Sequence, residues 1–310
     1  MQIFHEIEPG LLKQSAVAVG FFDGVHPGHQ VVIKKALQEA QKFNATPCVV
    51  TFKDHPRTLT AGISPPLLTT LDQRLSLFED LGIKATLLLE VREDICSLTA
   101  PQYVEQVLIS GLNAKSVSIG YNHHFGKNRE GNPQILQVLG NKLGFIVNVA
   151  EGLLIDGFEV SSSRIREALL KGNIEEANKL LGRPYEISGT VIRGDGRGRQ
   201  IGFPTANLQV TKEQLLPGLG VYAGIATLAD KTRHACVCNV GKRPTVKNDA
   251  PVNVEIHIHD FNQDIYNQKL SLEFLHFIRP ETKFASVDAL KDQIAKDCQS
   301  SRQLLCTSFS

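Results

Sequence analysis

The sequence predicts a two-part α/β protein, with an N-terminal parallel sheet flanked by helices and a small C-terminal antiparallel barrel followed by a helix. In the first part, short apolar runs alternate with segments of helical periodicity, which is typical of strand–helix–strand units. After Arg183-Pro184, closely spaced runs rich in β-branched residues are separated by turn residues. The length of 310 residues suits two domains. We therefore expect domains at residues 1–183 and 184–310.

The composition is that of an ordinary globular protein. Hydrophobic residues make up 42% and charged residues 21% of the chain, and the net charge of +1 does not indicate a nucleic-acid partner. The six cysteines form no Cys-x-x-Cys pair, which fits a reducing cytoplasm. The N-terminus resembles no signal peptide, and no run approaches the roughly 18 apolar residues of a membrane span. We expect a cytoplasmic protein with no membrane partner.

The first part is organised around the stretch Gly-Phe-Phe-Asp-Gly-Val-His-Pro-Gly-His at residues 20–29, between a predicted strand at 16–19 and a predicted helix at 30–43. A helix N-terminus directs free N–H groups and a positive dipole at a bound anion. His26 and His29 are three residues apart and share a helix face, where they can donate hydrogen bonds to phosphate oxygens. The other candidate ATP- or phosphate-binding residues of this stretch are Gly20, Phe22, Asp23 and Gly28.

Two familiar phosphate-binding motifs are absent from this stretch. No Gly-Lys-Ser/Thr follows it, as a P-loop would require, and Gly-x-Gly-x-x-Gly is absent. The alternative is that the two histidines are structural. Their placement at a strand–glycine–helix junction favours a nucleotide, and the stretch resembles the His-x-Gly-His signature of nucleotidyltransferases.

The remaining elements of the first part place several polar loops at one edge of the sheet. Carboxyl ends of parallel strands form the ligand-binding edge, so we expect His55 and Arg57 there. The loop at 120–132 follows the end of another strand. Either it contributes Asn122 and Phe125 to this binding edge, or it is an ordinary polar surface loop. The expected strands are residues 47–52, 86–90, 116–119 and 145–149, and the expected helices are residues 71–81 and 101–109.

A run of serines at residues 161–163 leads a further predicted helix. One serine suits an N-cap, but Arg164 and Arg166 in the first turns oppose the helix dipole. A bound anion such as a triphosphate accounts for these cations better than capping does. We therefore include Ser162 and Arg164 among the phosphate-binding candidates. A short helix at 174–181 follows.

The second part reads as strands joined by turns. The expected strands are residues 186–192, 220–228, 235–240, 252–259 and 270–277, and residues 287–297 read as a closing helix. Between the first two strands lies a cationic, glycine-rich loop that can bind phosphates through Gly196, Arg199 and Gly202. Thr205 and Asn207 follow it and offer neutral oxygens suited to Mg²⁺. The alternative is a long hairpin loop charged for solubility.

Alternation along residues 254–259 places Glu255, His257 and His259 on one strand face. A single glutamate there could act as a general base on a hydroxyl group. For the two histidines we favour simple exposure to water. The segment 278–284 follows a strand and could close a site through Arg279 and Phe284.

Taken in order, these motifs resemble those of the bacterial bifunctional riboflavin kinase/FAD synthetase family. The resemblance extends from Gly20 to about Asp297, and it includes Ser-Ser-Ser-Arg-Ile-Arg, Gly-Phe-Pro-Thr-Ala-Asn and Val-Glu-Ile-His-Ile. It implies a Rossmann-like nucleotidyltransferase domain followed by a riboflavin kinase barrel. It also implies that ATP and riboflavin give FMN, that ATP and FMN give FAD, and that Mg²⁺ takes part.

The resemblance also assigns roles to individual residues. It implies an adenylylation site in which His26 and His29 are catalytic and to which Asn122, Ser162 and Arg164 belong. In the barrel it implies that Thr205 and Asn207 are Mg–ATP ligands and that Glu255 is catalytic. It also implies that Arg279 closes over the flavin. The family's usual Phe-Arg-Phe-Gly is replaced by His123-His124-Phe125-Gly126, so an aromatic hydrocarbon face is lost. Ser163 replaces a threonine but keeps its hydroxyl.

Two other functions compete with this interpretation. One is a nucleotidyltransferase that acts on a different acceptor and whose barrel binds a ligand without catalysing a reaction. Thr205, Asn207 and Glu255 argue against it. The other is a flavin carrier or sensor on an inactive scaffold, against which the intact histidines and arginines argue. In each case we expect small-molecule substrates. Self-association is left open.

Overall fold

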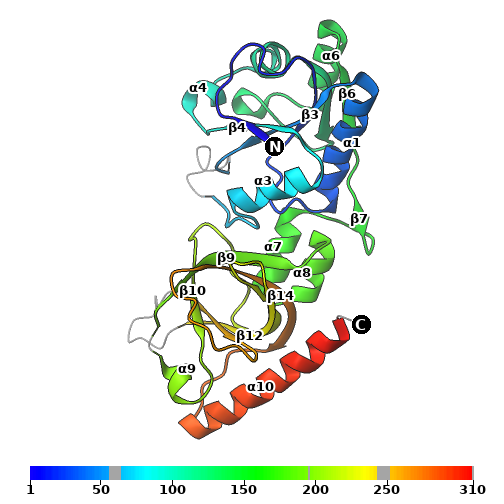
Figure 1. Ribbon diagram of the computed structural model, residues 1–310. Helices are drawn as coiled ribbons and strands as arrows, with labels where there is room; N and C mark the ends of the chain where they lie inside the picture. The colour runs from blue at the N-terminus through cyan, green and yellow to red at the C-terminus, as the bar shows by residue number, and fades with distance from the viewer. Residues whose placement is uncertain (56–63, 195, 243–251, 309–310) are drawn as a thin grey trace. The chain divides into compact units, whose positions relative to one another are not determined.

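The computed structural model describes residues 1–55, 64–194, 196–242 and 252–308. Arg57 lies outside these residues. The chain forms two compact units, Met1–Ser161 and Ser162–Ser310 (Figure 1).

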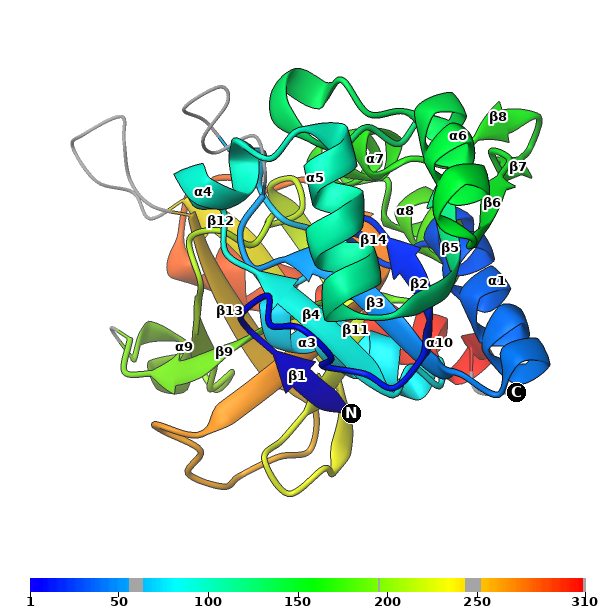
Figure 2. The same ribbon diagram turned by 90° about the horizontal axis from the view of Figure 1, so that it is seen from above.

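The first unit contains a parallel sheet, as predicted, and its six strands lie in the order β1-β4-β3-β2-β5-β6 (Figure 2). From β2 the chain moves to one side through β3 and β4, then returns to the other side of β2 at β5. Strand β1 was not expected because it is only three residues long. The strands are β1 (Gln2–Phe4), β2 (Ser15–Val19), β3 (Thr46–Phe52), β4 (Ala85–Leu89), β5 (Ala114–Gly120) and β6 (Ile146–Ala150).

Helices cover both faces of this sheet. On one face, α1 (Pro27–Phe43) and α3 (Leu71–Asp80) bury Ile33, Ala36 and Phe78 against Val49. On the other face lie α4 (Glu93–Cys96), α5 (Ala100–Tyr103), the π-helical η1 (Val104–Gly111) and α6 (Pro133–Leu143) (Figure 2). The segment expected as one α-helix at 101–109 is therefore divided between α5 and η1.

Helix α6 was not expected either, although Asn132 caps it by accepting from the Ile135 backbone N–H, and Pro133 begins it. A 3₁₀ turn, η2 (Lys127–Arg129), precedes it, and a small hairpin of β7 (Leu154–Ile155) and β8 (Phe158–Glu159) ends the unit.

The second unit begins with α7 (Ser162–Leu170) and α8 (Ile174–Leu181). Asn178 attaches α8 to the barrel, since its Nδ2 donates to Phe274 O at 2.8 Å and its Oδ1 accepts from the Tyr185 N–H at 2.7 Å. The compact units thus divide between Ser161 and Ser162, earlier in the chain than the change of pattern at Arg183-Pro184. These two helices pack with the barrel that follows them.

The second unit contains an antiparallel barrel, as predicted. The barrel is closed, and its strands lie in the order β10-β13-β12-β11-β14-β9. Its strands are β9 (Tyr185–Ile192), β10 (Ala206–Val210), β11 (Gly220–Thr227), β12 (Arg233–Lys242), β13 (Val252–Ile258) and β14 (Lys269–Arg279). Strand β10 was not expected, because its residues read as the end of the glycine-rich loop. That loop also contains the short helix α9 (Arg197–Gln200).

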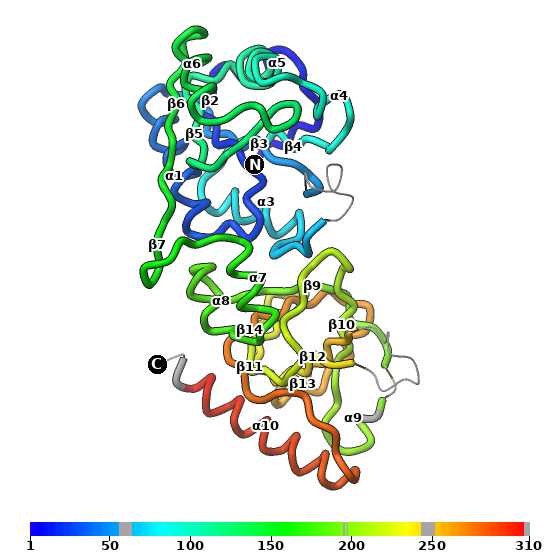
Figure 3. The backbone as a smooth tube through the Cα atoms, turned by 180° about the vertical axis from the view of Figure 1, so that it is seen from behind, coloured from blue at the N-terminus to red at the C-terminus, as the bar shows by residue number. Residues whose placement is uncertain are grey.

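The terminal helix α10 (Val287–Ser308) runs along the outside of the barrel and is much longer than expected (Figure 3). It buries Cys298 against Val221 and Val237, and Leu305 against Ala223 and Ile225. The outer face of β11 and β12 is therefore covered, and alternate residues such as Tyr222 and Cys238 fill the interior.

Candidate active sites

The stretch at residues 20–29 leaves β2 beside β5, where the strand order reverses direction. This topological switch point is the usual ligand position in an open α/β sheet. The turn is strained, because the buried Phe22 and Val25 have φ values of +58° and +42°. Such values are rare for side chains of this size and concentrate at functional sites. Gly20 is required beside them, since a Cβ there would lie 2.8 Å from the Phe22 ring.

His26 and His29 stack at the first turn of α1, with ring centroids 3.6 Å apart. His26 is the N-cap, and its Nδ1 accepts the His29 backbone N–H at 3.4 Å. An accepting Nδ1 on a neutral ring puts the proton on Nε2, which can then donate to a ligand. A Cβ on Gly28 would approach the His26 ring to 3.2 Å, so glycine allows the ring to lie against the helix start. The two histidines are therefore brought together, as predicted.

Buried polar contacts hold this turn from behind. The Asp23 carboxylate accepts the Leu68 N–H at 2.9 Å and the Thr69 N–H at 3.1 Å, so it ties the turn to the segment that leads into α3. Asp23 thus binds protein backbone at the place where phosphate binding was expected.

Arg74 of α3, which the sequence reasoning missed, is 2% exposed. It donates to Phe21 O at 3.0 Å and Phe52 O at 2.7 Å, and its guanidinium lies over the Phe21 ring. Burial lowers the pKa of Arg74 to about 10, so it is still charged at neutral pH. In the sequence, Arg74 could have been noticed as a charged residue four positions before the buried Phe78. The Phe21 ring also contacts His55, at 4.7 Å, which places His55 at this edge as expected.

The loop after β5 lies across the switch point from β2. Asn122 is exposed there, whereas Phe125 is 8% exposed and packs on Tyr103. Phe125 also pairs with Gly131, where a Cβ would come within 2.7 Å of the Phe125 ring. His123, which replaces the family's phenylalanine, turns its Nε2 inward without a hydrogen-bond partner. Burial lowers the pKa of His123 to about 4, which keeps the ring neutral.

Ser162 and Arg164 begin α7, in the second compact unit, and both are partly buried. Arg164 Nη2 lies 3.1 Å from Glu176 Oε1 of α8. The cation therefore has a carboxylate partner within its own unit.

In the barrel, strand register assembles a row of polar residues. Asn207 of β10 is directly opposite Glu255 of β13, which is in turn opposite Asn239 of β12. Directly opposed residues share a face of the sheet. Val254 and Ile256 are each 1% exposed, so they fill the interior, and the row lies on the outer face. Asn239 was not anticipated, because only the register reveals that it neighbours Glu255.

The glycine-rich loop approaches the start of β10 very closely. A Cβ on Gly194 would lie 2.3 Å from Asn207 Nδ2, and one on Gly198 would lie 3.1 Å from Thr205 Oγ1. Gly196, Arg199 and Gly202 are exposed on the same loop, with φ of +69° at Gly196 and +89° at Gly202. The loop therefore borders the candidate metal ligands Thr205 and Asn207, which are oxygen donors of the kind Mg²⁺ prefers.

Arg279 ends β14 and is held by the buried Asp297 of α10. Its Nε donates to Asp297 Oδ1 at 2.9 Å and its Nη2 donates to Oδ2 at 2.8 Å. The guanidinium lies 5.5 Å from the Phe284 ring centroid, so these two candidates are neighbours. Asp297 gave no signal in the sequence, because its partner is distant along the chain.

The expectation that both strand histidines meet water is wrong for His259. It is 6% exposed because α10 extends over it, and its Nε2 lies 3.1 Å from Ser301 Oγ of that helix. His257 is partly buried, with Nδ1 2.8 Å from Pro204 O.

Comparison with known proteins gives two family matches. Residues 9–164 match the FAD synthetase model and residues 181–305 match the riboflavin kinase model. A Haemophilus influenzae protein named bifunctional riboflavin kinase/FMN adenylyltransferase is 38% identical, covering 94% of both chains. One of the same name from Bacillus subtilis is 38% identical, covering 96% of both.

A solved structure described as a macrolide-efflux protein from Streptococcus pneumoniae is 31% identical, with a TM-score of 0.87 over 97% of this chain and 99% of that one. In the described part of this chain, every helix is too short or too polar to cross a membrane.

Proposed function

The chain belongs to the bifunctional riboflavin kinase/FMN adenylyltransferase family, and we propose that it phosphorylates riboflavin to FMN and then adenylylates FMN to FAD. The observation that carries this proposal is the opposed pair Asn207 and Glu255, which sets a carboxylate beside a candidate metal ligand in the barrel. A carrier or sensor would have no need of this pair. The stacked His26 and His29 supply a second, separate site in the first unit.

In the kinase reaction, Glu255 is the residue that acts on the acceptor. Riboflavin's 5′-hydroxyl is a weak nucleophile, and a nearby carboxylate can orient it and accept its proton. A bond then forms between that oxygen and the γ-phosphorus of ATP, while the bond to the departing ADP breaks. Arg279, fixed by Asp297, and the Phe284 ring close over the flavin.

Thr205 and Asn207 would hold Mg²⁺ in the kinase site. Their hydroxyl and amide oxygens suit this hard cation, and the glycines Gly194 and Gly198 let the loop backbone approach them closely. When bound, the ion neutralises phosphate charge that develops during transfer. Backbone N–H groups around Gly196 and Gly202, with the Arg199 guanidinium, orient the rest of the phosphate chain.

In the adenylyltransferase reaction, a phosphate oxygen of FMN attacks the α-phosphorus of ATP and pyrophosphate leaves. His26 Nε2 and the His29 ring donate hydrogen bonds to oxygens that gain charge, and the N-terminus of α1 adds its positive end. Gly20, Gly28 and Phe22 shape the turn that receives the phosphates, and Asp23 keeps that turn in place. Asn122 contacts the flavin, with Phe125 behind it. Ser162 and Arg164, carried by α7 in the second compact unit, are the remaining phosphate-binding candidates.

The proposal is tested by incubating the full chain with riboflavin, ATP and Mg²⁺ and separating the flavins by chromatography over time. FMN is expected first and FAD later, and supplied FMN should give FAD directly. Unchanged riboflavin that stays bound to the protein would instead identify a carrier. If supplied FMN gives FAD while riboflavin is left unchanged, only the adenylyltransferase part of the proposal stands.

We further propose a cytoplasmic location. All six cysteines are free thiols, and four of them are buried, which suits a reducing compartment. Cell fractionation with an antibody to the chain tests this location.

A further inference from the structure

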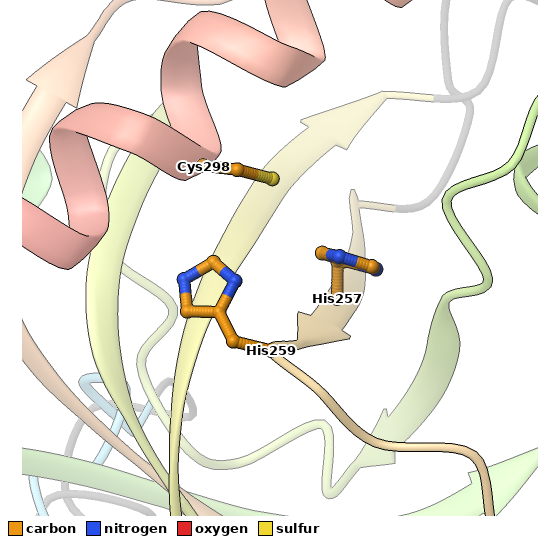
Figure 4. A group of neighbouring side chains, drawn as sticks. All are labelled: His257, His259 and Cys298. Atoms are coloured by element: carbon orange, nitrogen blue, oxygen red, sulfur yellow. The ribbon is translucent and has the colours of Figure 1, made fainter.

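His257, His259 and Cys298 gather between strand β13 and helix α10, and their ligand atoms lie within 4.8 Å of one another (Figure 4). The sulfur of Cys298 points from the helix toward the two imidazoles (Figure 4). Neither the proposed kinase reaction nor the adenylyl transfer uses these side chains. Two imidazoles and one thiol make a nitrogen–sulfur donor set, which suits zinc far better than magnesium or calcium.

The hydrogen bonds around His259 leave one ring nitrogen ready to bind a metal. Ser301 Oγ donates to Cys236 O at 2.9 Å, so the serine must accept at its contact with His259 Nε2, 3.1 Å away. The proton of His259 is therefore on Nε2. Its Nδ1 carries a lone pair and is buried without a hydrogen-bond partner, in a side chain that is 6% exposed. A buried, unsatisfied ring nitrogen costs free energy unless something binds it.

His257 is oriented by the same kind of contact. Its Nδ1 lies 2.8 Å from Pro204 O, and a carbonyl oxygen can only accept, so this nitrogen is the donor. Nε2 is then the free ligand atom of the neutral ring. A metal-binding histidine usually donates its other N–H to a carbonyl or similar acceptor. Both imidazoles therefore already have the outer hydrogen bonds of metal ligands.

We propose that His257, His259 and Cys298 form a zinc-binding site that fastens α10 to the barrel, beside the candidate kinase residues. A tetrahedral zinc site sets its nitrogen and sulfur ligands about 3.5 Å apart, so the three atoms must close by about 1 Å. On binding, the Cys298 thiol loses its proton to solvent and coordinates as thiolate. Water takes the fourth position and reaches it past the partly exposed His257.

The surroundings do not oppose a cation at this position. Arg302, the arginine of α10, pairs with Asp260 through contacts of 2.7 and 3.0 Å, and Arg279 pairs with Asp297. Both guanidinium charges are thus balanced. Since His257 bonds to Pro204 and Thr205 follows it, zinc would also stiffen the start of β10.

The test is a zinc titration of the reduced full-length chain by competition with a chromophoric chelator, in excess Mg²⁺. One zinc ion per chain is expected. Cys298→Ser should weaken zinc binding by about 100-fold or more, and Ser301→Ala, which frees His259 to rotate, by about 10–100-fold. Cys306→Ser, at an exposed cysteine of the same helix, is the matched control and should bind as the wild type does.

Co²⁺ supplies a second readout, because a thiolate bound to it gives a charge-transfer band. The band should be present in the wild type and in Cys306→Ser, and lost in Cys298→Ser. Circular dichroism checks folding. If Cys298→Ser does not fold, His257→Gln is used in its place. Zinc that Mg²⁺ displaces, or that binds equally well to wild type and Cys298→Ser, would overturn the proposal, since it would place the ion on other ligands.

Discussion

The candidate site in the first unit depends on the backbone of one turn, whereas the site in the barrel depends on the register of neighbouring strands. His26 and His29 are three residues apart and meet because a helix begins between them. Asn207 and Glu255 are far apart in the chain and meet because β10 pairs with β13. A local turn is sensitive to substitutions that change its own φ angles or cap. A site formed by the register of neighbouring strands is sensitive to anything that shifts a strand or the helix packed on it.

The largest effect is expected from Glu255→Gln. The amide keeps the shape of the side chain but cannot accept a proton, so FMN formation should fall by about 10²–10⁴. Conversion of supplied FMN to FAD should be unchanged, because Glu255 is not among the residues proposed for that reaction. Both half-reactions are measured on one preparation. Near-normal kinase turnover would remove Glu255 from the mechanism.

His29→Ala is the reciprocal experiment in the first unit. Loss of a hydrogen-bond donor to the developing charge should slow FAD formation by about 10²–10³, with FMN formation unaffected. His124→Ala, at an exposed histidine of the β5 loop, is the control. Equal loss of both activities would show that His29 supports the fold instead.

Two fragments test where the barrel unit begins. A chain of residues 162–310 should fold and make FMN, whereas 183–310 should be less stable by roughly 3–5 kcal/mol, since it lacks the buried side chains of α8. Those side chains are Ile174, Ala177, Leu180 and Leu181. Urea unfolding measures the difference. Identical midpoints would put the functional boundary at Arg183-Pro184.

His123→Phe tests acid sensitivity in the first unit. Burial lowers the pKa of His123 to about 4 in the folded chain, so the unfolded chain takes up its proton first as pH falls from about 6.5. The wild type should therefore lose on the order of 1–2 kcal/mol of stability between pH 7 and 5 through this group. The phenylalanine variant should lose less, and His124→Phe should match the wild type. The readout is the unfolding free energy at each pH, and parallel curves for all three chains would refute the role of His123.

The smallest effect concerns the start of α3. Thr70 forms a reciprocal cap with Gln73, and Thr99 forms the same cap with Gln102 on α5. Thr70→Ala and Thr99→Ala should each cost about 1 kcal/mol of stability. Only Thr70→Ala should also slow FAD formation, by a few-fold, because α3 carries Arg74 to the turn at Phe21. A slower reaction in both variants would mean that general destabilisation, and not the placement of Arg74, is responsible.

Most elements could be predicted because their signals are local. Runs rich in β-branched residues between turns located five of the six barrel strands, and helical spacing located α1. Strand β10 was missed because its five residues follow directly on a loop rich in glycine, and η1 because a π-helix has nearly the same apolar spacing as an α-helix. Helix α6 carried a cap and a proline in its sequence, and that signal was overlooked.

By itself, the sequence determined the two kinds of sheet, the strand–turn–helix character of residues 20–29 and the chemical types of Thr205, Asn207 and Glu255. Each is expressed within a few residues, as a period, a turn or a cap. Tertiary structure alone decided that Arg74 lies beneath the Phe21 turn, that Asn239 adjoins Glu255, and that Cys298 lies against His259. Those contacts join distant segments. They exist only once strand register and helix docking are set by the burial of apolar side chains around the whole barrel and sheet.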